Sequence, residues 1–103
     1  FNIGTANGPS CAPAIEAAAQ EVAAATGRSW VVNGRFRGGW TTRHYGRPET
    51  GVHAIQMELA QITHLETEAP PFALCPRKSA RLRETLAEIL TSLAALAPRL
   101  ARS

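Results

Sequence analysis

Three polar side chains near the middle of the chain have types and spacings that suit catalysis: Glu58, Gln56 and Arg43. Gln56 and Glu58 lie at the end of an apolar run that starts at Val52, and their spacing of two places them on one face of a predicted strand. A carboxylate that leaves a buried strand is partly desolvated, which suits it to proton transfer as a general base. The alternative is a salt bridge between Glu58 and a nearby arginine.

Arg43 and His44 lie in a run, 38–46, that has glycine at both ends. A guanidinium binds a carboxylate through two parallel hydrogen bonds, and glycines let a backbone approach a ligand closely. We therefore interpret Arg43 as a candidate clamp for an anionic substrate. A solvent-exposed charge at Arg43 and a structural imidazole at His44 are the alternatives.

The charges are unevenly distributed along the chain. Eleven basic residues stand against eight acidic ones, all of them glutamate, and no acid occurs between Glu21 and Glu49. Five arginines fall in that interval, which predicts an electropositive surface for an anion. The three histidines are 9 and 11 residues apart. That spacing matches no helical metal-binding pair, so no complete metal site is expected within the segment.

The same interval supports a function of another class. Aromatic residues alternate with the arginines, as in proteins that bind single-stranded nucleic acid by pairing phosphates and stacking bases. Only one Arg-Gly-Gly sequence is present, at 37–39, and the net charge is small. A nucleic-acid binding module is therefore the alternative to an enzyme.

The elements that must position these residues follow from periodicity and from glycine and proline. Pro13 and the apolar spacing after it predict a helix over 13–26, which Gly27 ends. Residues 29–33 and 52–59 have the patterns of strands, 34–40 reads as a loop, and 41–45 is expected to return to extended structure. A long amphipathic helix begins near Pro76 and ends or kinks at Pro98; its predicted apolar stripe contains Leu82, Leu86, Ile89, Leu90, Leu93, Leu96 and Leu100. This order predicts an α/β domain.

The composition predicts a soluble chain with a thin core. Hydrophobic residues make up 45% of it, but 19 of them are alanine. No apolar run is long enough to span a membrane. The chain starts at Phe1 and its one methionine is Met57, so we expect residues 1–103 to be a single segment of a longer polypeptide. Cys11 and Cys75 lack metal-site spacing and are expected to be buried free thiols of a cytoplasmic protein, with a disulfide between them as the alternative.

Four blocks of sequence, in order, resemble the carboxyl-terminal portion of the N-formylglutamate amidohydrolases. The resemblance covers nearly the whole chain, and the third and fourth blocks are the most specific. The blocks are residues 2–5 (NIGT), 10–13 (SCAP), 38–46 (GGWTTRHYG) and 52–61 (VHAIQMELAQ).

The resemblance implies an enzyme of bacterial histidine degradation that hydrolyses N-formyl-L-glutamate, or a similar acylated acidic amino acid, to glutamate and formate. It implies a zinc-peptidase-like three-layer α/β/α fold, with this chain as its carboxyl-terminal part. The implied divalent metal, expected to be zinc, takes its ligands from the amino-terminal half, which is also the expected partner. This segment alone is therefore expected to be inactive, and a noncatalytic relative is a further alternative.

The same resemblance implies roles for individual residues. Glu58 falls on the acidic residue expected to act as general base and acid, and Arg43 falls on the arginine expected to hold a substrate carboxylate. Gln56, His44 and Asn33 are implied to contribute to substrate binding. No metal ligand is carried over to this segment.

Overall fold

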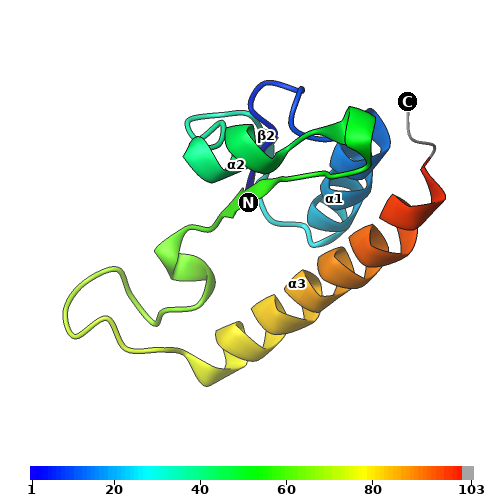
Figure 1. Cartoon of the computed structure of the whole chain (residues 1–103). Helices are drawn as coiled ribbons and strands as arrows, with labels where there is room; N and C mark the ends of the chain where they lie inside the picture. The colour runs from blue at the N-terminus through cyan, green and yellow to red at the C-terminus, as the bar shows by residue number, and fades with distance from the viewer. Residues whose placement is uncertain (101–103) are drawn as a thin grey trace.

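The structure, a computed structural model, describes residues 1–100; the last three residues of the predicted segment lie outside the described residues. The chain is an α/β protein with a small mixed sheet and a long carboxyl-terminal helix (Figure 1). Its strands are β1 (Asn2–Gly4), β2 (Val31–Val32) and β3 (Gln56–Glu58), and its α-helices are α1 (Pro13–Ala25), α2 (Trp40–Tyr45) and α3 (Pro76–Leu96). Short 3₁₀ turns occupy Pro48–Thr50, Gln61–Thr63 and Ala97–Arg99.

The central strand of the sheet is β1, which has no counterpart among the predicted elements. Strand β2 pairs parallel to β1, and β3 pairs antiparallel to it. Three residues that include a glycine are too few to show the alternation that identifies a strand. Glu58 pairs with Asn2, and Gln56 pairs with Gly4. The carboxyl end of β3 therefore lies beside the amino end of β1, unlike the all-parallel edge where α/β sheets usually bind ligands.

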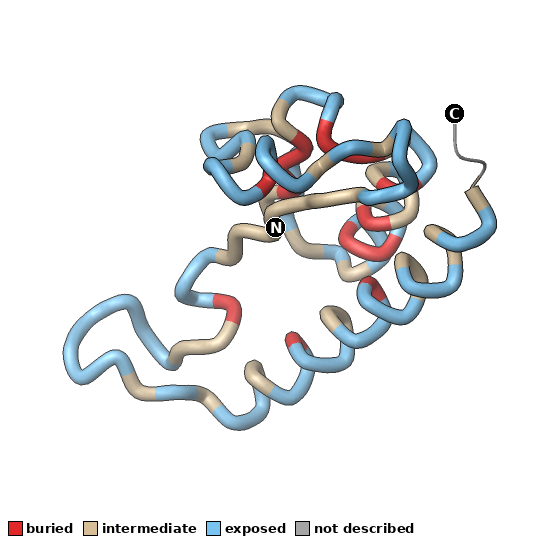
Figure 2. Tube along the Cα trace, in the orientation of Figure 1, coloured by how far each residue is buried: buried red, intermediate tan, exposed pale blue. Residues whose placement is uncertain are grey.

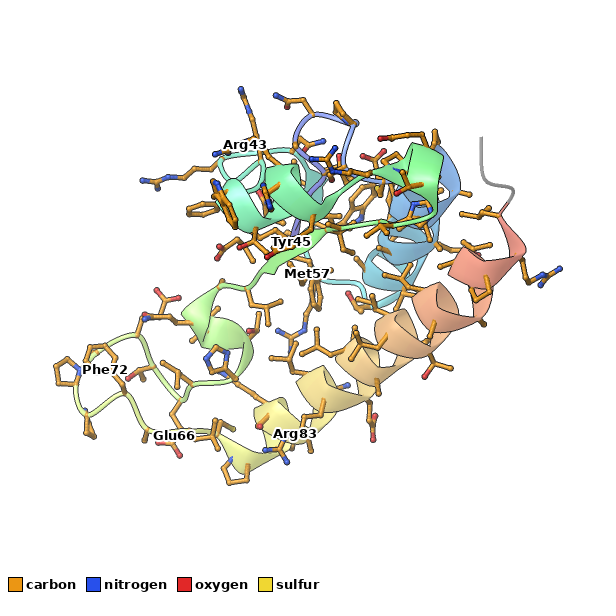
Figure 3. All side chains as sticks on the ribbon, viewed as in Figure 1. Arg43, Tyr45, Met57, Glu66, Phe72 and Arg83 are labelled. Carbon is orange, nitrogen blue, oxygen red and sulfur yellow. The ribbon has the colours of Figure 1, made fainter. Side chains whose placement is uncertain are left out.

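The two faces of the sheet differ in chemistry. Ile3 and Met57 are partners in the register, so both point to one face. Ile3 is fully buried against Ala19, Val22, Ala23 and Ile89, and Met57 packs against this cluster. Figure 3 shows Met57 on the side of β3 that faces α3. The other face presents Asn2, Gly4, Gln56 and Glu58, which confirms the alternation predicted for 55–58.

Helices α1 and α3 cover the apolar face. The prediction of 13–26 is confirmed to within one residue, and Gly27 has the left-handed φ of 76° that follows the helix. The long helix begins at Pro76 as predicted and gives way to a 3₁₀ turn that contains Pro98. Most of the buried residues lie in β1, in α1 and in the segment between them (Figure 2).

The predicted apolar stripe of α3 is wrong at Leu90. Leu82 and Ile89 are buried, whereas Leu90 is 68% exposed. Residues seven apart return to nearly the same side of a helix, but Leu90 is displaced from Ile89 by about 100°. Leu90 therefore points away from α1.

The loop that follows β2 covers the polar face of the sheet. A methyl group on Gly4 would lie 2.9 Å from the carbonyl carbon of Arg37. The Asn2 amide donates a hydrogen bond to the carbonyl of Phe36, and the Gly39 amide donates one to Gln56. The predicted loop is thus confirmed, and it packs directly on the face that carries Glu58.

The prediction of extended structure over 41–45 is wrong, because these residues belong to α2. The Arg43 amide donates to the Gly39 carbonyl, and Gly46 donates to Thr42. Thr42 is buried beside Gly38, where a Cβ would lie 3.0 Å from the threonine Cβ. This tertiary packing outweighs the strand preference of the two threonines.

The predicted strand 52–59 is also wrong in its first half, because only Gln56–Glu58 is a strand. Residues just before it bond to the segment that precedes α1. The Ala54 amide donates to the Ser10 carbonyl, and the Ser10 hydroxyl donates back to the Ala54 carbonyl. His53 accepts the Ala12 amide through Nδ1 at 3.0 Å. These bonds take the backbone away from the sheet.

The described residues form one helical layer, the sheet, and a loop layer with α2. Residues 59–75 connect β3 to α3 through a loop that projects from the body of the molecule (Figure 1). Within residues 1–100, no helix combines the length and apolar character that crossing a membrane requires.

Candidate active site

Glu58 lies half-buried at the end of β3, on the loop-covered face of the sheet. It borders a cavity of about 280 Å³ whose other walls include Arg35, Phe36 and Val31. Its Oε1 atom accepts a hydrogen bond from the side-chain amide of Gln56 at 3.1 Å, rather than from an arginine. The carboxylate is thus held at one oxygen and faces an open space.

Gln56 connects Glu58 to the loop. Its Oε1 atom accepts the backbone N–H of Gly39 at 2.9 Å, while its Nε2 atom donates to Glu58. Both ends of the amide are engaged by the protein. Because the amide cannot rotate without losing these bonds, Gln56 restricts the orientation of the carboxylate.

Arg43 is exposed on α2 and borders a different cavity, of about 210 Å³, beside Pro9, Ser10 and Gly46. Its Nη1 atom donates to the Gly38 carbonyl at 3.0 Å. A guanidinium has five N–H donors, so donors remain for an anion. No residue lines both this cavity and the one at Glu58.

His44 lies in a cluster of aromatic rings on α2. Its ring stacks on Trp40 with centroids 4.1 Å apart and planes inclined by 14°, and Tyr45 meets both rings edge-on. Trp40 is 60% exposed and Tyr45 is 54% exposed. The stack holds the imidazole in place beside Arg43, and a substrate-binding role for His44 stays a prediction.

Asn33 is held within a hydrogen-bond network at the end of β2. Its Oδ1 atom accepts the Thr5 amide at 2.8 Å and the Asn7 amide at 3.3 Å. Its Nδ2 atom donates to the Thr5 hydroxyl, which donates in turn to Glu16. These bonds give Asn33 a structural role in joining β1 to β2; its role toward substrate stays a prediction.

The structure adds two residues to the site that the sequence prediction did not include. Arg35 and Phe36 line the cavity at Glu58, with the Arg35 guanidinium 5.8 Å from the centre of the Phe36 ring. The absence of acids between Glu21 and Glu49 was a signal for Arg35. The sequence did not predict toward which cavity the Arg35 side chain points. The loop folds onto the sheet through Gly4, and this contact is tertiary.

A metal site would need donors that the described residues do not bring together. Within residues 1–100, no three His, Cys, Asp or Glu side chains gather as a metal ion requires. His53 accepts the Ala12 amide, and His64 shares a hydrogen bond with Thr63. Metal binding and the location of the metal ligands therefore stay predictions.

Both cysteines are free thiols as predicted; Cys11 is buried just before α1, whereas Cys75 is only partly buried, so the prediction of burial is wrong for Cys75. Burial, with a smaller contribution from the Glu16 carboxylate, raises the pKa of the Cys11 thiol from 9.0 to about 11. A thiol with such a high pKa carries little thiolate near neutral pH. Cys11 therefore does not suit nucleophilic chemistry.

Comparisons of the sequence with known proteins identify one family and two named relatives. The sequence model of the N-formylglutamate amidohydrolase family matches residues 1–65. A protein of Pseudomonas aeruginosa named N-formylglutamate deformylase is 51% identical over 96 residues, covering 92% of this chain and 36% of that protein. A protein of Pseudomonas putida with the same name is 47% identical over 96 residues, with the same coverage.

The chain thus spans 36% of the length of these curated relatives. No solved structure matches it. The zinc-peptidase-like three-layer fold therefore stays a prediction, and the family match rests on sequence.

Proposed function

The chain belongs to the N-formylglutamate amidohydrolase family, and we propose that it supplies the general base and the carboxylate clamp for hydrolysis of N-formyl-L-glutamate. The products would be glutamate and formate. The observation that carries this proposal is the placement of Glu58: half-buried, bonded at one oxygen by Gln56, and facing a cavity.

The proposed reaction requires one proton acceptor beside the attacking water. Water adds to the formyl carbon, and the Glu58 carboxylate takes a proton from that water. When the C–N bond breaks, the same carboxyl group returns the proton to the leaving nitrogen. Atoms and charge balance, because the proton removed from water ends on the amine of glutamate.

Arg43 is proposed to hold a carboxylate of the substrate. Its remaining N–H donors and the adjacent cavity can accept an anion. N-formyl-L-glutamate carries two carboxylates, which the arginines of the acid-free stretch complement electrostatically. The proposal requires one substrate to reach both the Arg43 cavity and the Glu58 cavity, so that holding its carboxylate orients the formyl group toward the base. His44 and Asn33 are proposed as further contacts to the substrate.

The metal expected from the resemblance is proposed to take its ligands from outside the described residues. Among residues 1–100 no three such donors gather, and the proposed proton transfer is assigned to the Glu58 carboxylate of this chain. The amino-terminal half that the resemblance implies is the proposed source of those ligands. This chain alone is accordingly expected to release no formate.

The proposal can be tested with a chimaera in which this chain replaces the matching segment of the Pseudomonas aeruginosa deformylase. We expect the chimaera, supplied with zinc, to release formate from N-formyl-L-glutamate, and the separate chain to release none. An inactive but folded chimaera would contradict the proposal. Salt-sensitive retention of this chain on single-stranded DNA would instead favour the nucleic-acid alternative.

A further inference from the structure

A continuous series of hydrogen bonds joins Arg43 to Glu58. The Arg43 Nη1 atom donates to the Gly38 carbonyl at 3.0 Å. The N–H of the same peptide unit, which belongs to Gly39, donates to Gln56 Oε1 at 2.9 Å. The Gln56 Nε2 atom then donates to Glu58 Oε1 at 3.1 Å. Two amide groups thus connect the cation of one cavity to the anion of the other.

All three bonds run in the same direction. Each amide in the series accepts a bond on the side of Arg43 and donates one on the side of Glu58. Amides arranged in this way polarise one another, and each bond strengthens the next by roughly 10–30%. The positive charge at one end and the negative charge at the other reinforce this polarisation. A change of charge or of hydrogen bonding at either end therefore alters the strength of the other bonds in the series.

Close packing lies next to the peptide unit in the centre of the series. A Cβ atom on Gly4 would lie 3.0 Å from the Gly38 nitrogen, which belongs to the preceding peptide unit, so the loop rests directly on β1 just before the 38–39 unit. Gly38 has a left-handed φ of 116°, and a Cβ there would meet Thr42 at 3.0 Å. Side chains are therefore excluded at both positions. This packing, together with the bonds to Arg43 and Gln56, restricts the movement of the central peptide unit.

We propose that the 38–39 peptide unit and Gln56 form a relay through which Arg43 positions the Glu58 carboxylate, with Gln56 as a positioning residue rather than a substrate ligand. The proposal rests on the proposed function, which makes Arg43 the clamp and Glu58 the base. When a substrate carboxylate binds Arg43, the guanidinium changes the geometry and strength of its hydrogen bond to the Gly38 carbonyl. The relay transmits this change to Glu58, so that clamp and base respond together.

The relay can be tested without activity, on the 103-residue chain itself. The probe is the ¹³Cδ resonance of Glu58 at constant pH, together with the backbone amide resonance of Gly39. Arg43→Met should displace both signals, because it removes the first donor of the series. In a Gln56→Met background, the displacement of the Glu58 signal by Arg43→Met should fall at least about threefold.

Controls separate the relay from the long-range field of a charge. Arg47→Met removes one positive charge from the same stretch, and the side chain of Arg47 takes no part in the relay; it should leave both signals nearly unchanged. Gln56→Asn, whose shorter side chain cannot span both partners, serves as a second variant if Gln56→Met does not fold. Equal responses of Glu58 to Arg43→Met with and without Gln56 would overturn the relay.

The active chimaera provides an independent measurement. Gln56→Met should lower kcat with little change in KM, because it disturbs the base and leaves the substrate contacts intact. A raised KM with unchanged kcat would instead make Gln56 a substrate ligand and overturn its positioning role. If the chimaera is inactive, the proposed function fails, and the resonance measurements still decide the relay.

Discussion

Gly4 and Arg37 are in backbone contact across the sheet and its covering loop, so that a methyl group on Gly4 would lie 2.9 Å from the Arg37 carbonyl carbon. This contact sets the height of the loop above the polar face. The position of the peptide unit that bonds to Gln56 depends on it, and so does the orientation of Glu58.

We expect Gly4→Ala to displace the loop and to destabilise the chain by about 1–3 kcal/mol, as overpacking of a filled site does. Urea unfolding measures the change in free energy of unfolding. Gly39→Ala is the matched control, because a Cβ there would meet only the Gln56 Oε1 atom, at 3.6 Å. Equal stability of Gly4→Ala and the unchanged chain would show that the loop has room to move.

Glu58→Gln in the active chimaera should reduce turnover at least about a hundredfold, since an amide cannot accept the proton of the attacking water. KM should change little, because the two side chains have the same shape. Glu66→Gln, at an exposed position in the projecting loop, should leave turnover unchanged (Figure 3). Near-normal turnover of Glu58→Gln would remove Glu58 from the mechanism.

Arg43→Ala in the chimaera should raise KM more than it lowers kcat, because the clamp contributes uniform binding of the substrate. Arg47→Ala provides the control for loss of one positive charge. The decisive comparison uses an N-formylated amino-acid amide without carboxylates, whose turnover should be insensitive to Arg43→Ala. Equal effects on both substrates would argue against the clamp.

The pKa of Cys11 predicts a loss of stability at alkaline pH. Above pH 9.0 the thiol of the unfolded chain loses its proton, whereas the folded chain retains the proton until about pH 11. Ionisation therefore stabilises the unfolded state in this window, and the free energy of unfolding falls by up to ~1.4 kcal/mol per pH unit. Below pH 9.0 this contribution to stability is fully present.

The check is denaturant unfolding of the unchanged chain and of Cys11→Ala between pH 8 and pH 11. Only the unchanged chain has the Cys11 thiol. Its free energy of unfolding should therefore fall relative to that of Cys11→Ala as the pH rises. Parallel pH profiles would mean that the Cys11 thiol ionises equally in both states.

Local sequence patterns were sufficient to predict α1 and α3. Pro13 and Gly27 delimit α1, and the spacing from Leu82 to Ile89 identifies the packed side of α3, because helix ends and helix faces are decided by residues within one or two turns. The alternation of Met57 with Glu58 likewise assigned each to the correct face of β3. These features depend on short-range geometry, which the sequence states directly.

The structure of residues 53–54, of α2 and of β1 depends on contacts with residues that are distant in sequence. Residues 53 and 54 leave the sheet because they bond to the segment before α1, and 40–45 becomes helical because Thr42 packs under Gly38. Strand β1 is a strand only through its two neighbours.

The sequence by itself determined the family, the two long helices, and Glu58 and Arg43 as candidate residues, since motifs and periodicity are properties of neighbouring positions. The tertiary structure decided that Glu58 and Arg43 face separate cavities and are joined through a peptide unit and Gln56. Hydrogen bonds between a loop and a strand require both to be folded. Their geometry therefore becomes visible only when the loop lies on the sheet.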